Sequence, residues 1–119
     1  MIKELSVEAL RRVEGWRCVQ DACAATQVEE GFTSDLLSDI LANAPAQSVL
    51  VTLQSHLNTV AVASLAGVRA IVLCSGREAP QDMLDAARRE GILLLQTNDN
   101  QYQASVKLEA AFRSGSVGS

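Results

Sequence analysis

The sequence contains few aromatic side chains. Trp16, Phe32, Tyr102 and Phe112 amount to 3% of the 119 residues, whereas hydrophobic residues make up 48%. Leu, Val, Ile and Ala must therefore form almost the whole core, which is typical of parallel strands covered by helices of small residues. The length fits a single domain. We assign this domain to residues 1–113 and expect residues 114–119, which are Ser, Gly and Val, to be a flexible tail.

Long apolar segments are also missing. Lys3, Glu4 and Glu8 interrupt the first ten residues, where a signal peptide needs an apolar run. The longest apolar stretch, Thr59–Val68, is about half as long as a membrane-spanning helix. Three cysteines leave one unpaired in any disulfide scheme, which favours reduced thiols. We therefore expect a cytoplasmic protein that does not associate with membranes.

The sequence lacks the usual catalytic and metal-binding motifs. It has no GxxxxGK[ST] phosphate loop, and its only lysines are Lys3 and Lys107. No nucleophile elbow surrounds Ser55, and a single histidine with Cys18 and Cys23 is insufficient for a structural zinc site. A net charge of −4 opposes the phosphate contacts that nucleic-acid binding needs. We predict no enzyme, no metal, no cofactor and no nucleic-acid partner.

The first third of the chain predicts two helices and two short strands. An apolar stripe predicts a helix over Ile2–Glu14, ended by Gly15, and β-type patterns predict strands at Trp16–Gln20 and Ala25–Glu29. A further helix begins near Thr33 or Ser34 as cap, with Asp35 at its positive end, and stops at Pro45. Its predicted buried stripe is Leu36, Leu37, Ile40, Leu41 and Ala44.

The rest of the chain repeats a strand and a helix three times. The apolar runs Val49–Leu53, Ala70–Cys74 and Ile92–Gln96 are nearly continuous, as in strands buried on both faces of a parallel sheet. Each run is followed by a helical stretch, starting near Asn58, Pro80 and Asn98–Asn100. The predicted fold is α/β, a mainly parallel sheet with helices packed on it, with three βα repeats after an N-terminal helix and two short strands.

Polar loops follow each of these three strands. In an open parallel sheet, ligands bind beyond the carboxyl ends of the strands, where backbone N–H groups at helix starts also converge. We therefore predict a site there for a small anionic metabolite or nucleotide. The candidate ligand-binding residues are Gln54, Ser55, His56, Asn58, Ser75, Gly76, Arg77, Thr97 and Asn98.

Three of these candidates have alternative interpretations. His56 either donates a hydrogen bond to a bound anion or shuttles a proton, or it hydrogen-bonds a neighbouring backbone group and fixes its own loop. Arg77 either binds an anion or is a solvated arginine paired with Glu78. Gly76 is better explained by the turn than by a ligand.

The helix over Asn58–Ala66 is almost free of charge on all sides. A helix that is apolar all round must be buried on both faces. A homodimer is one way to cover it, and the remaining helices with the N-terminal segment are the other.

Two runs resemble a known family. GFTSDLLSDILANA (Gly31–Ala44) and VTLQSHLNTVAVASLAGVRAIVLCSGREAP (Val51–Pro80) resemble the DRTGG domain, which is similar to the N-terminal domain of HPr kinase/phosphorylase. The resemblance covers Ile2–Phe112 and is most specific at Asp35–Ser38 and Thr52–Asn58. It implies an α/β module that occurs alone or attached to phosphotransacetylases, CBS-containing pyrophosphatases and HPr kinases, as a regulatory, ligand-sensing or oligomerising part.

The sequence departs from this family at one turn. Glu29-Glu30-Gly31 stands where the family tends to have Thr-Gly-Gly. Two carboxylates at this turn disfavour an anionic ligand there.

Three functions are compatible with the sequence. The first is a non-catalytic regulatory or ligand-sensing module, homodimeric, which binds a small anionic metabolite or nucleotide, a partner enzyme, or both. The second is an enzyme that uses His56 as acid/base or phosphate carrier. The third is a purely structural dimerisation domain.

Overall fold

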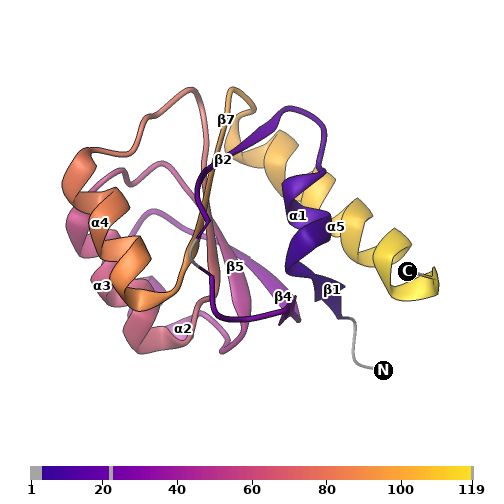
Figure 1. Cartoon of the computed structure of the whole chain (residues 1–119), viewed down its shortest axis with the longest axis horizontal. Coiled ribbons are helices and arrows are strands. Elements are labelled where there is room, and N and C mark those ends of the chain that lie inside the picture. Colours follow the sequence, from indigo (N-terminus) through magenta and orange to yellow (C-terminus); the bar gives the residue numbers. More distant parts are fainter. Residues whose placement is uncertain (1–3, 22, 119) are drawn as a thin grey trace.

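A five-stranded sheet separates two layers of helices in the computed structural model, which describes residues 4–21 and 23–118, the side chains of 115–118 excepted (Figure 1). The strand order is β2-β7-β6-β5-β4. Four strands are parallel: β4 (Glu30–Thr33), β5 (Ser48–Thr52), β6 (Ala70–Leu73) and β7 (Leu93–Thr97). The edge strand β2 (Trp16–Gln20) runs antiparallel to β7. The predicted mainly parallel α/β sheet is confirmed.

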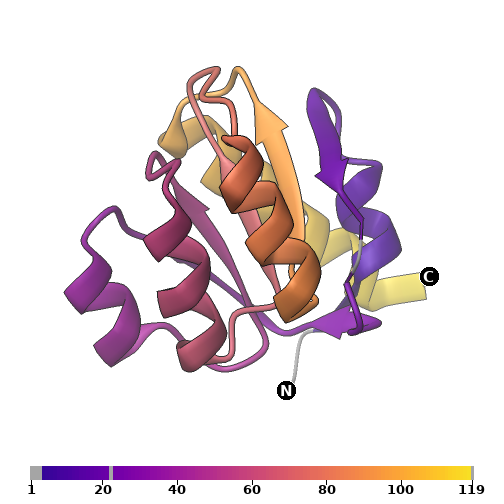
Figure 2. The ribbon, with the colours of Figure 1, turned by 60° about the vertical axis from the view of Figure 1, so that its left-hand side comes forward.

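The helices cover both faces of this sheet. One layer contains α2 (Leu37–Asn43), α3 (Leu57–Ala66) and α4 (Gln81–Glu90), and the other contains α1 (Val7–Arg11) and α5 (Gln101–Gly118) (Figures 1 and 2). The strand and helix pairs β5–α3, β6–α4 and β7–α5 are the three predicted βα repeats.

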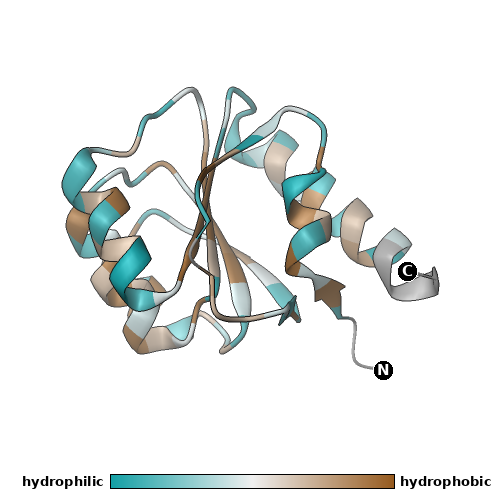
Figure 3. Cartoon of the chain, viewed as in Figure 1, coloured by the Kyte–Doolittle hydropathy of each residue, from teal (hydrophilic) through white to brown (hydrophobic). Residues whose placement is uncertain are grey.

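The continuous apolar runs fill both faces of the sheet. All residues of β5, β6 and β7 are buried, and the strands between the helical layers carry much of the hydrophobic colour in Figure 3. Neighbouring residues alternate between two cores, as the pleat requires: Val49 and Val51 belong to the core beneath α1 and α5, whereas Leu50 belongs to the core beneath α2–α4. The absence of an apolar/polar alternation in these strands follows from this two-sided burial.

The N-terminal helix is shorter than the sequence predicts. Ile2 lies outside the described residues, and Leu5 and Ser6 form a short strand, β1 (Leu5–Ser6), that pairs with β3 (Gln27–Val28). The helix starts only at Val7, because the Ser6 hydroxyl accepts a hydrogen bond from the Ala9 N–H at 3.1 Å and caps it. Pairing with a distant segment thus overrides the helical periodicity of residues 2–14.

The strand predicted at Ala25–Glu29 is present but shorter, because only Gln27 and Val28 pair, as β3. A second strand, β4, begins at Glu30, beyond the predicted end of the strand. Glu29 separates β3 from β4, and its N–H donates to the Gln47 carbonyl at 2.8 Å. Gly31 lies inside β4, where it pairs with Val49, and not in a turn. A Cβ at this position would lie 2.7 Å from Leu108 Cδ2, so the strand has room only for glycine there. The mostly exposed pattern of β4 gave no hydrophobic signal from which to predict it.

The helix α2 differs from its prediction at its start and on its buried face. Its N-cap is Leu36, not Thr33 or Ser34, although the Ser34 hydroxyl accepts a hydrogen bond from the Leu36 N–H at 3.3 Å. Ile40 alone of the predicted stripe is fully buried, and Leu36 and Leu41 are 64% and 50% exposed. The reason is that α2 lies at the end of its layer and has α3 as its helical neighbour on one side (Figure 2).

The helix α3 lies between α2 and α4, but its outer face is open. Thr59, Val60 and Ala63 are buried, whereas Leu65 is 76% exposed. We considered two ways to cover this helix, a homodimer or the remaining helices with the N-terminal segment. The neighbouring helices cover only the two sides of α3, and the N-terminal segment lies on the other face of the sheet, beside α5 (Figure 1).

The helix α5 runs to Gly118 and includes most of the segment in which we expect a flexible tail. The division into residues 1–113 and 114–119 stays a prediction. None of the helices in the described ranges has the length and apolar character needed to cross a bilayer.

Candidate functional site

The loops after β6 and β7 are tied together at the carboxyl edge of the sheet. The Ser75 N–H donates to the Asp99 carbonyl at 2.7 Å, and the Gly76 N–H donates to the Thr97 carbonyl at 2.9 Å. Ser75 and Gly76 have φ values of 60° and 72°, so the loop reverses sharply there. A Cβ on Gly76 would lie 3.4 Å from Asn98 Oδ1. The structure therefore brings Ser75, Gly76, Thr97 and Asn98 together.

Asp35 organises the loops after β4 and β5. One of its carboxylate oxygens, Oδ1, accepts hydrogen bonds from Thr52 Oγ1 at 3.0 Å, from the Leu53 N–H at 2.7 Å and from Gln101 Nε2 at 3.0 Å. The Gln54 amide donates to the Asp35 carbonyl at 2.7 Å. This one residue thus joins β4, β5 and the start of α5.

Sequence reasoning assigned Asp35 only to the positive end of a helix. Asp35 is the first residue of the Asp35–Ser38 element, one of the two most specific parts of the family resemblance, and that element was the available signal for its role. Its hydrogen-bond partners are 17 and more positions away in the chain. No local pattern reports contacts at such a separation.

Two predicted site residues hold this edge together from inside. The Gln54 amide is committed to Asp35, and the Gln54 carbonyl accepts a hydrogen bond from Thr59 Oγ1 at 3.0 Å. Thr97 is 3% exposed, and its hydroxyl accepts a hydrogen bond from the Asp99 N–H at 3.1 Å. Their polar groups therefore position the loops.

His56 is the N-cap of α3. Its Nδ1 accepts a hydrogen bond from the Asn58 N–H at 3.0 Å, which is the loop-fixing role considered for it. The imidazole is exposed, and within the described part of the chain it makes no second hydrogen bond. Its Nε2 therefore remains available to a ligand. Ser55 is half-buried and Asn58 is exposed beside it.

Arg77 is exposed in the loop after β6. Its backbone N–H donates to the Cys74 carbonyl at 3.2 Å. Among the described residues its guanidinium forms no ion pair, so the pairing with Glu78 that we considered is not formed. Together with His56, Ser75 and Asn98, it presents polar groups to solvent at this edge.

Two titratable groups beneath the loops have shifted pKa values. Burial, followed by the charges of Asp99 and Asp35, raises the pKa of the Cys74 thiol to about 11, so this sulfur is not a nucleophile at neutral pH. A hydrogen bond from Lys107, whose Nζ lies 2.8 Å from Asp99 Oδ2, is the main cause that lowers the pKa of Asp99. Across the described ranges no three His, Cys, Asp or Glu side chains form a group suited to a metal ion.

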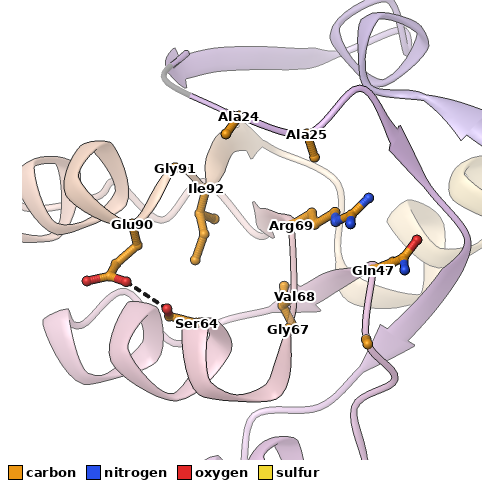
Figure 4. Close-up of a pocket in the computed structure, with 11 residues that line it drawn as sticks. Ala24, Ala25, Gln47, Ser64, Gly67, Val68, Arg69, Glu90, Gly91 and Ile92 are labelled. Atoms are coloured by element: carbon orange, nitrogen blue, oxygen red, sulfur yellow. Dashed lines mark hydrogen bonds between the residues drawn. The ribbon is translucent and has the colours of Figure 1, made fainter.

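The larger described pocket lies elsewhere. It has a volume of about 450 Å³ and opens at the amino-terminal edge of the sheet, where α3 and α4 end and β6 and β7 begin (Figure 4). None of the nine candidate residues lines it. A second pocket, of about 150 Å³, lies between β4 and α5.

The architecture is a DRTGG-like α/β fold. A solved structure with this fold is that of the CBS and DRTGG domains of the regulatory region of Clostridium perfringens pyrophosphatase, complexed with its activator diadenosine tetraphosphate. The two superpose with a TM-score of 0.76 at 8% sequence identity, over 90% of this chain and 47% of that chain. This chain therefore spans about half the length of its structural neighbour. No family model and no curated protein sequence matches the chain.

Proposed function

We propose that this chain is a non-catalytic regulatory module that senses a small anionic metabolite or nucleotide at the carboxyl edge of its sheet. The observation that carries the proposal is its fold, which it shares over 90% of its length with a regulatory region that binds a nucleotide activator. The site lies where open parallel sheets bind their ligands. The likeness to the N-terminal domain of HPr kinase/phosphorylase and docking on a partner enzyme belong to the same proposal.

The exposed groups at this edge suit an anion. Arg77 offers a guanidinium fork that has no partner among the described residues. No side chain caps α4 at Pro80, and the Met83 N–H of its first turn already donates to the Pro80 carbonyl at 3.0 Å. The N–H groups that precede Met83 in the helix are therefore the ones open to an acceptor. His56 Nε2 and the Asn98 amide add further hydrogen-bonding groups.

The same geometry supports a non-catalytic role. His56 Nδ1 accepts a hydrogen bond from the Asn58 N–H, so the neutral imidazole carries its proton on Nε2, which can donate to an anion but cannot act as a general base. Cys74 is buried and neutral. We therefore assign these groups to binding and to structure.

Thermal unfolding with diadenosine tetraphosphate, ATP, AMP and acetyl-coenzyme A tests this proposal. A ligand present at a hundredfold excess over its dissociation constant should add about 2.7 kcal/mol to the free energy of unfolding. Arg77→Gln should remove most of this effect. His56→Asn, which keeps a good helix cap but lacks the imidazole, should reduce it. Arg88→Gln, on the exposed surface at the other end of α4, is the matched control.

Two results would contradict the proposal. One is the absence of stabilisation by any compound of this panel. The other is a stabilisation that Arg77→Gln and Arg88→Gln leave equally intact, which would place the ligand away from the carboxyl edge.

A second candidate function, dimerisation, is favoured by the outer face of α3. Leu57, Ala61 and Leu65 follow one another at a spacing of four and are exposed along one face of a helix that carries no charged residue, and Leu65 is 76% exposed. Exposed apolar surface of this kind is typical of protein interfaces. Light scattering should give the mass of a dimer for the wild type and of a monomer for Leu65→Glu, which folds because Leu65 packs against little. A monomeric wild type, or a dimer that survives the substitution, would exclude this interface.

A further inference from the structure

The pocket at the amino-terminal edge of the sheet is lined by none of the residues of the carboxyl edge discussed above. We infer that it binds a small zwitterion whose carboxylate and ammonium are separated by an apolar spacer, such as an ω-amino acid or a short peptide. Its volume of about 450 Å³ lies in the range of small-molecule sites. Figure 4 shows Glu90 beside Ser64 at one end, Arg69 at the other, and Ile92 between them.

The Arg69 end is suited to a carboxylate. Arg69 is half-buried, and its Nη1 donates to the Gln27 carbonyl at 3.0 Å, which holds the side chain in place. A guanidinium has five N–H donors in a planar fork, and this bond uses one of them. No carboxylate of the described chain lies within ion-pair distance of it. A positioned, partly desolvated arginine without an anion favours bidentate binding of an external carboxylate.

The Glu90 end is suited to an ammonium group. Glu90 is the last residue of α4, and its Oε1 accepts a hydrogen bond from the Ser64 hydroxyl at 2.7 Å. The carboxyl ends of α3 and α4, capped by Gly67 and Gly91, line the same pocket and add partial negative charge. No cationic side chain of the described residues pairs with Glu90. Arg88 and Arg89 are exposed and do not line the pocket.

The space between the two charges is apolar. Val68 and Ile92 line it and are 3% and 2% exposed, and Ala24 and Ala25 form the opposite wall. Arg69 and Glu90 do not pair with each other, although both line this one pocket. A ligand with charges at both ends and methylene groups between them therefore satisfies both side chains and covers the apolar wall.

A titration with ω-amino acids tests this inference. Backbone amide shifts of Ala24, Gly67 and Gly91 are followed by NMR during addition of 4-aminobutanoate, 6-aminohexanoate and 8-aminooctanoate. One of these lengths should bind at least about tenfold more tightly than hexanoate and hexylamine, which carry one charge each. Arg69→Gln should abolish the advantage over hexylamine. Glu90→Gln should abolish the advantage over hexanoate.

Controls separate a lost site from a lost fold. Glu90→Gln keeps the hydrogen bond from Ser64 and sits at the exposed rim, so it should unfold at the wild-type temperature. Arg69→Lys keeps the charge but not the fork, and should bind more weakly than wild type and more tightly than Arg69→Gln. Arg88→Gln should leave all affinities unchanged. The inference is overturned if no pocket amide shifts with any chain length, or if the zwitterions bind no more tightly than their singly charged analogues.

Discussion

Replacing Asp35 by alanine should destabilise the protein more than the loss of any other exposed or half-buried carboxylate. Its Oδ1 accepts hydrogen bonds from Thr52, Leu53 and Gln101. Thr52 is fully buried and Leu53 is half-buried, so their donors cannot turn to solvent when the acceptor is removed. Gln101 has a longer, flexible side chain that can.

The magnitude follows from these two stranded donors. An unsatisfied buried donor costs about 1–3 kcal/mol, so Asp35→Ala should lower the free energy of unfolding by about 3 kcal/mol. For a domain of this size that corresponds to a fall in Tm of about 12 °C. Asp35→Asn keeps one acceptor oxygen and should cost about 1 kcal/mol.

Urea and thermal unfolding followed by circular dichroism measure these differences. Glu78→Ala is the matched control, because Glu78 is an exposed carboxylate in a neighbouring loop, and it should change stability by less than about 0.5 kcal/mol. If Asp35→Ala were as stable as Glu78→Ala, Asp35 would not be the residue that holds the loops of this edge together.

Three further predictions concern other parts of the fold. Because the pKa of Asp99 is lowered, its pairing with Lys107 stabilises the folded state above about pH 4, and this stabilisation is lost as the pH falls through the lower pKa of Asp99 in the folded state. Lys107→Met should therefore lower the free energy of unfolding by about 1 kcal/mol at neutral pH, measured by urea unfolding, and by much less at about pH 2. Ellman's reagent at neutral pH should leave Cys74 unmodified in the native protein and label it in urea, since the thiol is buried and its pKa is about 11; rapid native labelling would contradict this. Gly31→Ala should lower the free energy of unfolding by about 1–2 kcal/mol and so lower the urea midpoint, because its Cβ would lie 2.7 Å from Cδ2 of the buried Leu108. An unchanged midpoint would mean that the Leu108 side chain moves aside at no cost.

The sequence predicted those parts of the fold whose signal is local. Continuous apolar runs predicted β5, β6 and β7, because burial on both faces removes polar residues from each. Gly67 and Gly91 take φ values of 85° and 69° and end α3 and α4, and glycine at such a position is a local signal for the end of a helix. The strand β2 was predicted at its observed bounds.

The misplaced elements depend on contacts between distant segments. Leu5 has a helical spacing in the sequence, yet it pairs with Val28 in a strand. Thr33 belongs to an edge strand whose backbone pairs with β5 while its side chain is exposed. Periodicity cannot report such pairing, because the partners are far apart in the chain.

For the site, topology predicted the place and missed the residue that organises it. The rule for parallel sheets placed the loops of Ser75 and Asn98 at one edge, and the hydrogen bonds between these loops follow from that topology. Asp35 was missed because its hydrogen bonds join three elements. The pocket around Arg69 was missed because the same rule directs attention to the opposite edge of the sheet.

The position of Glu29-Glu30-Gly31 at the edge strand β4 gives a physical consequence to the two carboxylates that depart from the resembled family. β4 is four residues long, and only β5 pairs with it in the described sheet, so its outer backbone groups are a template on which another chain could add a strand. Glu30 is exposed on this strand and Glu29 immediately precedes it. Two like charges at this position repel the same segment of a second molecule, so the carboxylates that disfavour an anionic ligand there also protect the protein from aggregation through its open edge.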